Sequence, residues 1–372
     1  MSSKVYYTDF HTTVDEPLTK KLARLILTAG MDQIDFQGKF VAIKMHFGEP
    51  GNLAFLRPNY ARVVADVVKD LGGKPFLTDC NTLYIGGRKN ALDHLDSAYQ
   101  NGFVPYATGC QVIIADGLKG TDEVDVPVEG GEYVKTAKIG RAVMDADIVI
   151  SLTHFKCHEE AGVGGAMKNV GMGCGSGAGK REMHSDGRPL TDREKCVGCG
   201  ACAKICAHKG PKLRDGKMEI DWSTCVGCGR CMAVCPVGAI YPAYQHSASL
   251  LGCKIAEYTK AVLAGRPSFH ISLVQDVSPY CDCHAENDVP VVPDVGMFAS
   301  FDPVALDQAC ADACLKQEPI PGSLLDDNMH AEGFCDHHDH FKNTTPETDW
   351  KSCLEHAEKI GLGSRSYELI RV

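Results

Sequence analysis

Residues 196–206 read CVGCGACAKIC, and residues 225–236 read CVGCGRCMAVCP. Both stretches place four cysteines with two, two and three residues between them. In chains with this repeat, short turns bring three thiolates together while the fourth cysteine reaches across to the other set. The pattern therefore predicts two sites of four cysteines each. We assign Cys196, Cys199, Cys202 and Cys235 to the first site, and Cys225, Cys228, Cys231 and Cys206 to the second.

The spacing is that of bacterial ferredoxins, and it predicts two 4Fe-4S clusters as cofactors. A pair of structural zinc sites is the alternative, because CxxC repeats also suit tetrahedral zinc. Zinc needs four ligands per site but does not require the CxxCxxCxxxC run twice, so iron-sulfur fits the pattern better. The first run departs from the ferredoxin pattern in one position, since Ala207 follows Cys206 where proline is usual. The ligand is intact, so the departure concerns the turn rather than the cluster.

The residues around these cysteines favour a small α+β module. Between the two cysteine runs, Lys212 to Trp222 predicts a hairpin with a tight turn at Asp215-Gly216. We place a ferredoxin-like insert at residues 191–245, between two parts of an α/β host domain at 1–190 and 246–372. Glycines lie between the ligands, where the backbone turns tightly and points amides at sulfur: Gly198, Gly200, Gly227 and Gly229.

The chain has 372 residues, 19 cysteines and a formal net charge of -10. The cluster cysteines must be reduced thiolates, which predicts a reducing compartment rather than disulfides. No N-terminal run reads as a signal peptide, and no apolar stretch reaches the length that spans a bilayer. We therefore expect a soluble cytoplasmic protein of anaerobic or low-potential metabolism, with no membrane partner. The acidic balance argues against nucleic acid as a partner, because no broad cationic face is available to phosphates.

Outside the insert, strands alternate with helices, which predicts an α/β fold with a mixed or parallel sheet and helices on both faces. In such sheets ligands bind beyond the carboxyl ends of the strands. Asp302 and Pro303 begin one helix as N-cap and first residue. Predicted strands cover residues 4–8, 40–46, 75–78, 111–115, 147–152, 269–274 and 295–299, and other predicted helices cover residues 16–29, 58–71, 91–100, 141–146 and 246–265.

Polar residues mark the carboxyl ends of three predicted strands. Lys44 and His46 end the first, Asp79 and Asn81 follow the second, and THFKCHE at 153–159 follows the third. A single histidine there is more often structural, but two histidines and a lysine leaving one buried strand are costly to desolvate without a matching ligand. We predict catalytic roles for His154, Lys156, His158, His46 and Lys168.

Residues 162–180 read GVGGAMKNVGMGCGSGAGK, and their glycines let the backbone approach a ligand closely. A phosphate loop is excluded, because the GxxxxGK[ST] pattern fails at Cys174 and at Arg181. One interpretation is a flexible connection into the insert. The other is an anionic substrate site next to the clusters, lined by Lys168, Asn169, Lys180, Arg181 and His184.

Three further groups of cysteine, histidine or aspartate residues lie after the insert. Cys281, Cys283 and His284 form a C-x-C-H run, which supplies at most part of a metal site and leaves open whether a further metal binds. Residues 336–340 read DHHDH, which we interpret as a solvated loop rather than a metal site. Cys310 and Cys314 share one face of a predicted helix, most simply as small buried side chains.

Six stretches of the chain together resemble one known family: KMHFGEPGN at 44–52, TDCNTLY at 78–84, SLTHFKCHE at 151–159, GGAMKNVGMGC at 164–174, VPDVGMFASFDPVALDQAC at 292–310 and SYELI at 366–370. The chain is similar to the domain-of-unknown-function family numbered 362, in particular to its branch with a two-cluster ferredoxin insert. The resemblance covers nearly the whole chain. It implies an iron-sulfur protein with an α/β host domain, and it supplies no catalytic residues.

Three functions are compatible with these features. The first is an iron-sulfur oxidoreductase whose clusters relay low-potential electrons to a small, anionic substrate, with His154, Lys156 or His158 donating protons. The second is a ferredoxin-like electron carrier that docks to a partner redox protein and has no substrate chemistry. The third is a maturation or scaffold protein that passes on clusters or metal through Cys281, Cys283 and His284. We favour the first, because the host domain is larger than a carrier needs.

Overall fold

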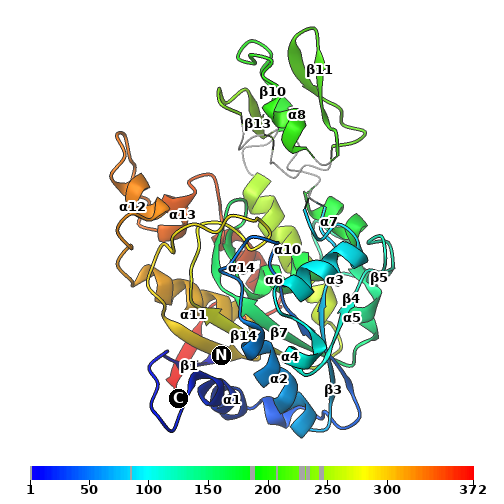
Figure 1. Cartoon of the computed structure of the whole chain (residues 1–372), viewed down its shortest axis with the longest axis vertical. Coiled ribbons are helices and arrows are strands. Elements are labelled where there is room, and N and C mark those ends of the chain that lie inside the picture. The colour runs from blue at the N-terminus through cyan, green and yellow to red at the C-terminus, as the bar shows by residue number, and fades with distance from the viewer. Residues whose placement is uncertain are drawn as a thin grey trace.

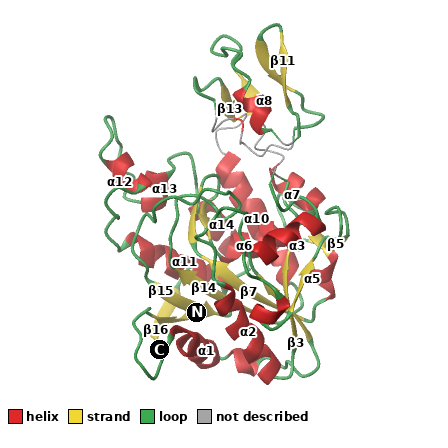
Figure 2. Ribbon diagram, viewed as in Figure 1, coloured by secondary structure: helices red, strands yellow, loops and turns green. Residues whose placement is uncertain are grey.

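One sheet of eight strands organises the larger part of the molecule (Figures 1 and 2). The computed structural model describes residues 2–83, 86–184, 189–206, 208–225, 231, 235–242 and 247–372. The strands lie in the order β16-β1-β15-β14-β7-β2-β3-β4. Their bounds are β1 (Ser3–Thr8), β2 (Phe40–Lys44), β3 (Lys74–Asp79), β4 (Gln111–Ile114), β7 (Ile148–His154), β14 (Ser268–Val274), β15 (Gly296–Ser300) and β16 (Tyr367–Arg371).

The sheet is mixed. Strand β15 runs antiparallel to its neighbours β1 and β14, and the other neighbouring pairs are parallel. The α/β class predicted from the sequence is therefore confirmed. The strand predicted at 147–152 is longer than expected, because β7 continues to His154, which is paired with Leu273 of β14. After it, β8 (Lys156–His158) pairs with β9 (Gly162–Gly164), so most of the THFKCHE stretch is strand.

Helices cover both faces of the sheet, because successive side chains of a strand point to opposite faces. In β7, Ile150 and Leu152 pack in one core with residues of α1 and α2, whereas Val149 packs in another core with Ile255 of α10. A third core joins α11 and α14 to β1, β14 and β15. The helices of these layers are α1 (Leu18–Thr28), α2 (Pro58–Asp70), α3 (Ala91–Gln100), α4 (Pro105–Thr108), α5 (Arg141–Asp145), α6 (Ala166–Cys174), α10 (Ser247–Leu263), α11 (Pro303–Leu315) and α14 (Lys351–Lys359).

Helix α11 begins where the sequence predicts. Its first residue is Pro303, and the side chain of Asp302 accepts hydrogen bonds from the N–H groups of Val304 and Ala305. This cap satisfies amides that have no partner within the helix. The glycine-rich segment at 162–180 is also regular: it forms β9, α6 and the first part of α7 (Gly177–His184). Its interpretation as a flexible connection is therefore wrong.

A smaller unit within residues 189–242 lies apart from the sheet, at the top of Figure 1. Strand β10 (Pro189–Thr191) pairs with β13 (Ile240–Pro242), and β11 (Pro211–Arg214) pairs with β12 (Lys217–Ile220). Helix α8 (Ala201–Ile205) packs against β11. Asp215 and Gly216 have positive φ values of 49° and 72°, which confirms the predicted hairpin turn. The domain limits given above stay a prediction.

The described secondary structure of the host also includes α12 (Leu324–Met329), α13 (His340–Thr344), a 3-10 helix at Met31–Gln33 and the antiparallel pair β5 (Glu123–Pro127) and β6 (Thr136–Gly140). Asp339 caps α13 and is buried, whereas residues 336–338 are exposed, so only part of the DHHDH stretch is a solvated loop. Cys310 and Cys314 are buried on α11, as predicted. None of the helices in the described ranges is both long enough and apolar enough to cross a membrane.

Candidate functional site

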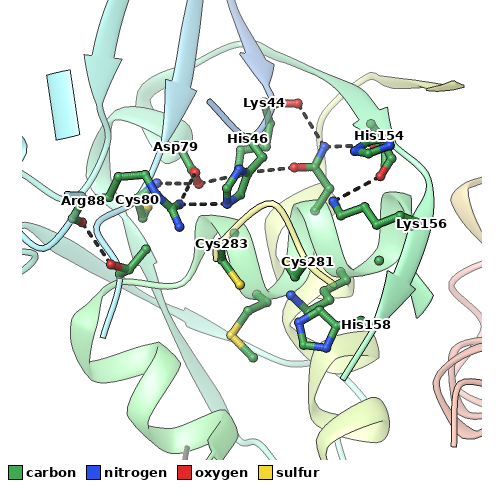
Figure 3. Close-up of a pocket in the computed structure, with 18 of the residues that line it drawn as sticks. Lys44, His46, Asp79, Cys80, Arg88, His154, Lys156, His158, Cys281 and Cys283 are labelled. Carbon is green, nitrogen blue, oxygen red and sulfur yellow. Dashed lines mark hydrogen bonds and ion pairs between the residues drawn. The ribbon is translucent and has the colours of Figure 1, made fainter. Parts of the chain in front are cut away.

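A cavity lies beyond the carboxyl ends of β2, β3 and β7 (Figure 3). The strand order changes direction at β2: β3 and β4 follow it on one side of the sheet, whereas β7, the next strand of this sheet along the chain, lies on the other side. Ligands of open α/β sheets bind at such a change of direction. The centre of a water molecule can occupy about 80 Å³ of the cavity, which leaves room for a small ligand. The lining includes Lys44, His46, Asp79, Cys80, Leu83, Arg88, Thr153, His154, Lys156, His158, Lys168, Asn169, Met172, Lys180, His184, Cys281 and Cys283.

A buried ion pair joins the ends of β2 and β3. Nζ of Lys44 lies 3.0 Å from Oδ1 of Asp79, and both side chains are almost fully buried. Burial alone would raise the pKa of Asp79, but Lys44 and the neighbouring His94 hold that pKa well below its usual range. Asp79 therefore stays ionised and balances the charge of Lys44.

Asn169 of α6 braces two strand ends from the opposite side. Its Oδ1 accepts from Nζ of Lys44 at 2.8 Å. Its Nδ2 donates to the carbonyl oxygen of Lys44 at 3.1 Å and to Oγ1 of Thr153 at 2.9 Å. The glycine-rich segment thus carries a side chain that fixes β2 relative to β7 at the cavity.

Arg88 is fully buried at a second wall of the cavity. Its Nε donates to Oε2 of Glu49 at 2.8 Å, and its Nη1 lies 2.8 Å from Nε2 of His46. Burial and the charge of Arg88 hold the pKa of His46 well below its ordinary value. His46 is therefore neutral at pH 7 and adds no positive charge to the cavity.

Asp282 anchors a third wall. Its carboxylate lies 3.0 Å from Nδ1 of His154 and 3.1 Å from Nζ of Lys156. Nε2 of His154 lies 2.8 Å from the carbonyl oxygen of Gln275, so both ring nitrogens have protein partners. Burial alone would raise the pKa of Asp282, but His154 and Lys156 lower it overall. His154 and Lys156 thus hold the loop that carries Asp282.

Two cysteines and a histidine meet on that loop's side of the cavity (Figure 3). The sulfur atoms of Cys281 and Cys283 and a ring nitrogen of His158 all lie within 4.8 Å of one another. The Cys283 thiol donates to Cys281, and this hydrogen bond lowers the pKa of Cys281 and raises that of Cys283, with Lys168 and Lys156 further lowering the former. Such a set can hold a thiophilic metal ion or react as a pair of thiols.

Positive charge enters the cavity from α6 and α7. Lys168 makes no hydrogen bond or ion pair with any residue that the structure describes, and it faces the lumen. Nζ of Lys180 donates to the carbonyl oxygens of Gly173 and Gly175, and it forms no ion pair with a described carboxylate. Burial, together with the charge of Lys168, lowers the pKa of His184 to about 3. The two lysines therefore make this side of the cavity attractive to anions.

The structure brings most of the predicted site residues together. The lining includes the five residues predicted as catalytic, whose roles stay a prediction: His46, His154, Lys156, His158 and Lys168. Asn81 and Arg181 lie outside it, since Asn81 donates to Asp116 and Arg181 is exposed. His284 also lies outside, in contact with Glu159.

Sequence reasoning missed Arg88, Glu49 and the role of Asp282. These residues come from three loops that are far apart in the chain. One signal was readable: a carboxylate placed directly between two cysteines needs a partner if the cysteines are buried. That signal points to Asp282 but does not identify His154 and Lys156 as the partners.

The smaller unit holds a second candidate site. Cys196, Cys199, Cys202 and Cys235 line one small cavity, which is the set assigned to the first cluster. The amide of Met218 donates to the sulfur of Cys196, at 3.3 Å, and the amide of Ala239 donates to the sulfur of Cys235, at 3.2 Å. These contacts place amide donors on sulfur, as clusters with thiolate ligands require.

The second set is described in part. The amide of Gly210 donates to the sulfur of Cys206 at 3.4 Å, and a Cβ at position 210 would lie 3.3 Å from Cα of Cys225. Cys206 and Cys225, two predicted ligands of the second cluster, therefore both lie next to Gly210. Cys231 is buried, and Cys228 lies outside the described residues.

One contact links this unit to the cavity of the host. Nε2 of His208 lies 2.7 Å from the carbonyl oxygen of Leu83. His208 follows Cys206 by two residues, and Leu83 lines the cavity. A ligand loop of the second cysteine set thus lies directly against the cavity wall.

Comparisons with known proteins give one family and distant structural relatives. A crystal structure of a protein from Thermotoga maritima matches with a TM-score of 0.43 and 10% identity, over 83% of this chain and 60% of that one. The lactate racemase apoprotein from Thermoanaerobacterium thermosaccharolyticum matches with a TM-score of 0.33 and 12% identity, over 73% of this chain and 51% of that one. Neither similarity is strong enough to inform function.

Among curated proteins, the thylakoid-associated protein sll1697 of Synechocystis sp. (strain ATCC 27184 / PCC 6803 / Kazusa) is 27% identical over 143 residues. The match covers 37% of this chain and 38% of that protein, so the similarity concerns only part of each. A family model described as domain of unknown function (DUF362) matches residues 41–312. Because this match spans well over half of the chain, the protein belongs to the DUF362 family, as the six sequence stretches indicate.

Proposed function

We propose that this protein is an iron-sulfur redox protein, in which two 4Fe-4S clusters in residues 196–235 serve a substrate cavity at the strand ends of the host sheet. The contact between His208 and Leu83 carries the proposal, because it joins a cysteine loop of the smaller unit to the wall of the cavity. When bound, such clusters supply electrons one at a time, at potentials of roughly -700 to +450 mV.

The donor set in the smaller unit fits clusters. Four cysteines surround one cavity, and main-chain amides donate to the sulfurs of two of them, Cys196 and Cys235, and to Cys206 of the second set. The backbone at Gly198 also supports this use, since a Cβ there would lie 2.3 Å from the carbonyl oxygen of Gly216. Only glycine permits the loop of the first set to approach the hairpin so closely.

The cavity favours a small anionic substrate. Lys168 faces the lumen without a partner among the described residues, and Lys180, which also lines the cavity, has only carbonyl oxygens as hydrogen-bond partners in that part of the chain. An ammonium group can both hold an anion and give up a proton during its reduction. Lys156 and His154 are engaged by Asp282, so we assign them the positioning of the 281–283 loop.

A ferredoxin-like carrier without substrate chemistry is the second candidate. The exposed position of Cys199 favours it, because an exposed cluster edge suits transfer to a docking partner. The buried charges of the host cavity favour the first candidate, since a carrier has no use for them.

An anaerobic experiment separates the two. The protein is purified without oxygen, its iron and sulfide are counted, and the dithionite-reduced form is mixed with fractionated metabolites or with redox proteins. We expect about eight irons per chain, as two 4Fe-4S clusters require, and reoxidation by an anionic metabolite fraction. Reoxidation by redox proteins alone would identify a carrier, and zinc in place of iron would refute the proposal.

The contact to Leu83 gives the matched variants. His208→Ala should slow reoxidation by the metabolite while leaving the iron content unchanged. Lys204→Ala is the control, because it alters an exposed residue of α8 that precedes Cys206 by two residues. It should change neither the rate of reoxidation nor the iron content. Equal rates for the two variants would remove the support that this contact gives.

A further inference from the structure

The C-x-C pair lines the same cavity, and we infer that Cys281 and Cys283 form a redox-active dithiol that reduces small anionic disulfides. This inference deepens the proposed function by naming its substrate class, and it rests on that function for the source of electrons. The dithiol itself can be tested independently of the clusters.

The first support is the placement of the two thiols. Their sulfur atoms lie within 4.8 Å of each other, both residues line the cavity, and neither forms a disulfide in the structure. Between them, Asp282 is held by His154 and Lys156. The loop is therefore fixed at its centre, while both thiols project from it toward the lumen.

The second support is the tautomer of His158. Its Nδ1 accepts the N–H groups of Glu160 and Ala161, at 3.0 and 3.1 Å. A neutral ring whose Nδ1 accepts carries its proton on Nε2. Nε2 has no hydrogen-bond partner within the described ranges, so its N–H can donate a hydrogen bond to a ligand in the cavity.

The same tautomer argues against a metal at this place. A histidine that ligates a metal through one nitrogen normally donates the proton on its other nitrogen to a neighbour. His158 instead accepts two amide protons at Nδ1. The ring is thus arranged as a hydrogen-bond donor beside two thiols rather than as the third ligand of a metal.

The third support is charge. Lys168 has no hydrogen bond or ion pair with any residue that the structure describes, whereas Lys156 is paired with Asp282. A carboxylate on the substrate can therefore pair with Lys168 while its sulfur atoms approach the dithiol. The narrow cavity restricts the substrate to a small molecule.

The reaction balances as follows. The sulfur of Cys281, as thiolate, attacks one sulfur of the substrate disulfide; the substrate S–S bond breaks, and its leaving thiolate accepts a hydrogen bond from the Nε2–H of His158 and takes the proton of the Cys283 thiol. The thiolate of Cys283 then attacks the sulfur of Cys281, which breaks the mixed disulfide, releases the second substrate sulfur as a thiolate that takes a proton from solvent, and leaves a Cys281–Cys283 disulfide. Two electrons and one proton restore the Cys281 thiolate and the Cys283 thiol, and 4Fe-4S clusters, when bound, would supply the electrons.

The first test detects the couple itself. Full-length protein is equilibrated anaerobically in buffers with different ratios of oxidised to reduced dithiothreitol. Its free thiols are then alkylated, and mass spectrometry gives the mass of the peptide that contains residues 281–283. We expect that peptide to pass from two alkyl groups to none, with a loss of two hydrogens, across a defined range of potential. Cys283→Ser should abolish the transition, and Cys157→Ala, which alters a buried cysteine outside the cavity, should retain it.

The second test detects the substrate class. Dithionite-reduced protein, freed of excess reductant, is mixed with lipoate, a small anionic disulfide, or with lipoamide, its neutral counterpart. We expect lipoate to reoxidise the protein about tenfold faster, because a charge-assisted hydrogen bond contributes roughly 1.5–3 kcal/mol. Lys168→Ala should remove this preference, and Cys281→Ser should abolish reoxidation by both compounds.

Several outcomes would overturn the inference. The first is that the 281–283 peptide keeps both alkyl groups at every potential. The second is that the protein binds a metal tightly and that Cys281→Ser releases it. The third is that the Cys281→Ser variant still reduces lipoate. Iron and sulfide counts on the same samples report on the proposed function separately. If the protein contains iron and sulfide but the 281–283 peptide shows no redox transition, the proposed function is retained and the dithiol inference is rejected.

Discussion

The carboxylate of Asp282 lies 3.0 Å from Nδ1 of His154, and it is fully buried between two cysteines of the cavity. The same carboxylate balances Lys156. One acidic residue therefore keeps two cationic or polar side chains of β7 and β8 in place, and its removal leaves a buried charge without compensation.

Asp282→Asn should lower the free energy of unfolding by about 3–5 kcal/mol, because an unpaired buried charge is that costly. Urea denaturation followed by circular dichroism measures the change. The matched control is Asp66→Asn, since Asp66 pairs with Arg62 at 2.6 Å on an exposed part of α2. That change should cost less than about 1 kcal/mol. A loss for Asp282→Asn no larger than for the control would contradict this role.

Buried histidines should make the protein sensitive to mild acid. Burial lowers the pKa of His94 to about 3, and its ring nitrogens have no hydrogen-bond partner in the described structure. The unfolded chain binds a proton near pH 6.5 and the folded one does not. Stability is therefore lost as pH falls from about 6.5 toward 3, by up to roughly 1.4 kcal/mol per pH unit for each such histidine.

His94→Leu should flatten this dependence, so that the variant gains more stability at pH 5.0 than at pH 7.5 relative to the unchanged protein. Urea midpoints at the two pH values provide the measurement. His11→Gln alters an exposed histidine and should leave the pH dependence as it was. The same gain at both pH values would mean that His94 is not kept neutral by burial.

Gly198→Ala should damage the smaller unit more than Gly200→Ala. Both glycines have positive φ, at 67° and 76°, so both substitutions strain the backbone by about 1–2 kcal/mol. At position 198 the new Cβ also meets the Gly216 carbonyl oxygen, whereas nothing lies within 4 Å at position 200. Iron content per chain and the thermal midpoint of the iron-sulfur absorbance should fall further for Gly198→Ala. Equal losses would show that the approach to the hairpin is unimportant.

Asn169→Ala should loosen the cavity. The amide bonds Lys44 and Thr153, so its loss leaves buried partners unsatisfied at a cost of roughly 1–3 kcal/mol. Hydrogen exchange should increase at the ends of β2 and β7 and stay unchanged in β15. Asn59→Ala, at an exposed position of α2, serves as the control. Unchanged exchange at the strand ends would refute the bracing role.

Much of the host could be predicted from the sequence because its signals are local. The helix at Ala91–Gln100 and the Asp302 cap follow from residue spacing and capping chemistry, and both are observed. The direction of β15 and the position of β16 beside β1 could not be predicted, because strand order depends on contacts between segments far apart in the chain.

The same distinction holds for the site. Lys44, His46 and His154 could be predicted to share one place, because parallel strands end at the same edge of the sheet. Arg88 and Asp282 could not, since they reach the cavity from loops whose paths no local pattern determines. Sequence likewise could not show that His154 has both ring nitrogens engaged, which depends on the position of Gln275.

Strands β7 and β14 are neighbours in the sheet, yet residues 189–242 lie between them in the chain. During synthesis, the cysteine-rich unit therefore leaves the ribosome before β14 does. The central sheet stays open on that side until translation has passed it, and Cys281 and Cys283 are added later still. The order of synthesis gives the smaller unit a period in which it can fold, and gather what its cysteines bind, before the cavity beside it exists.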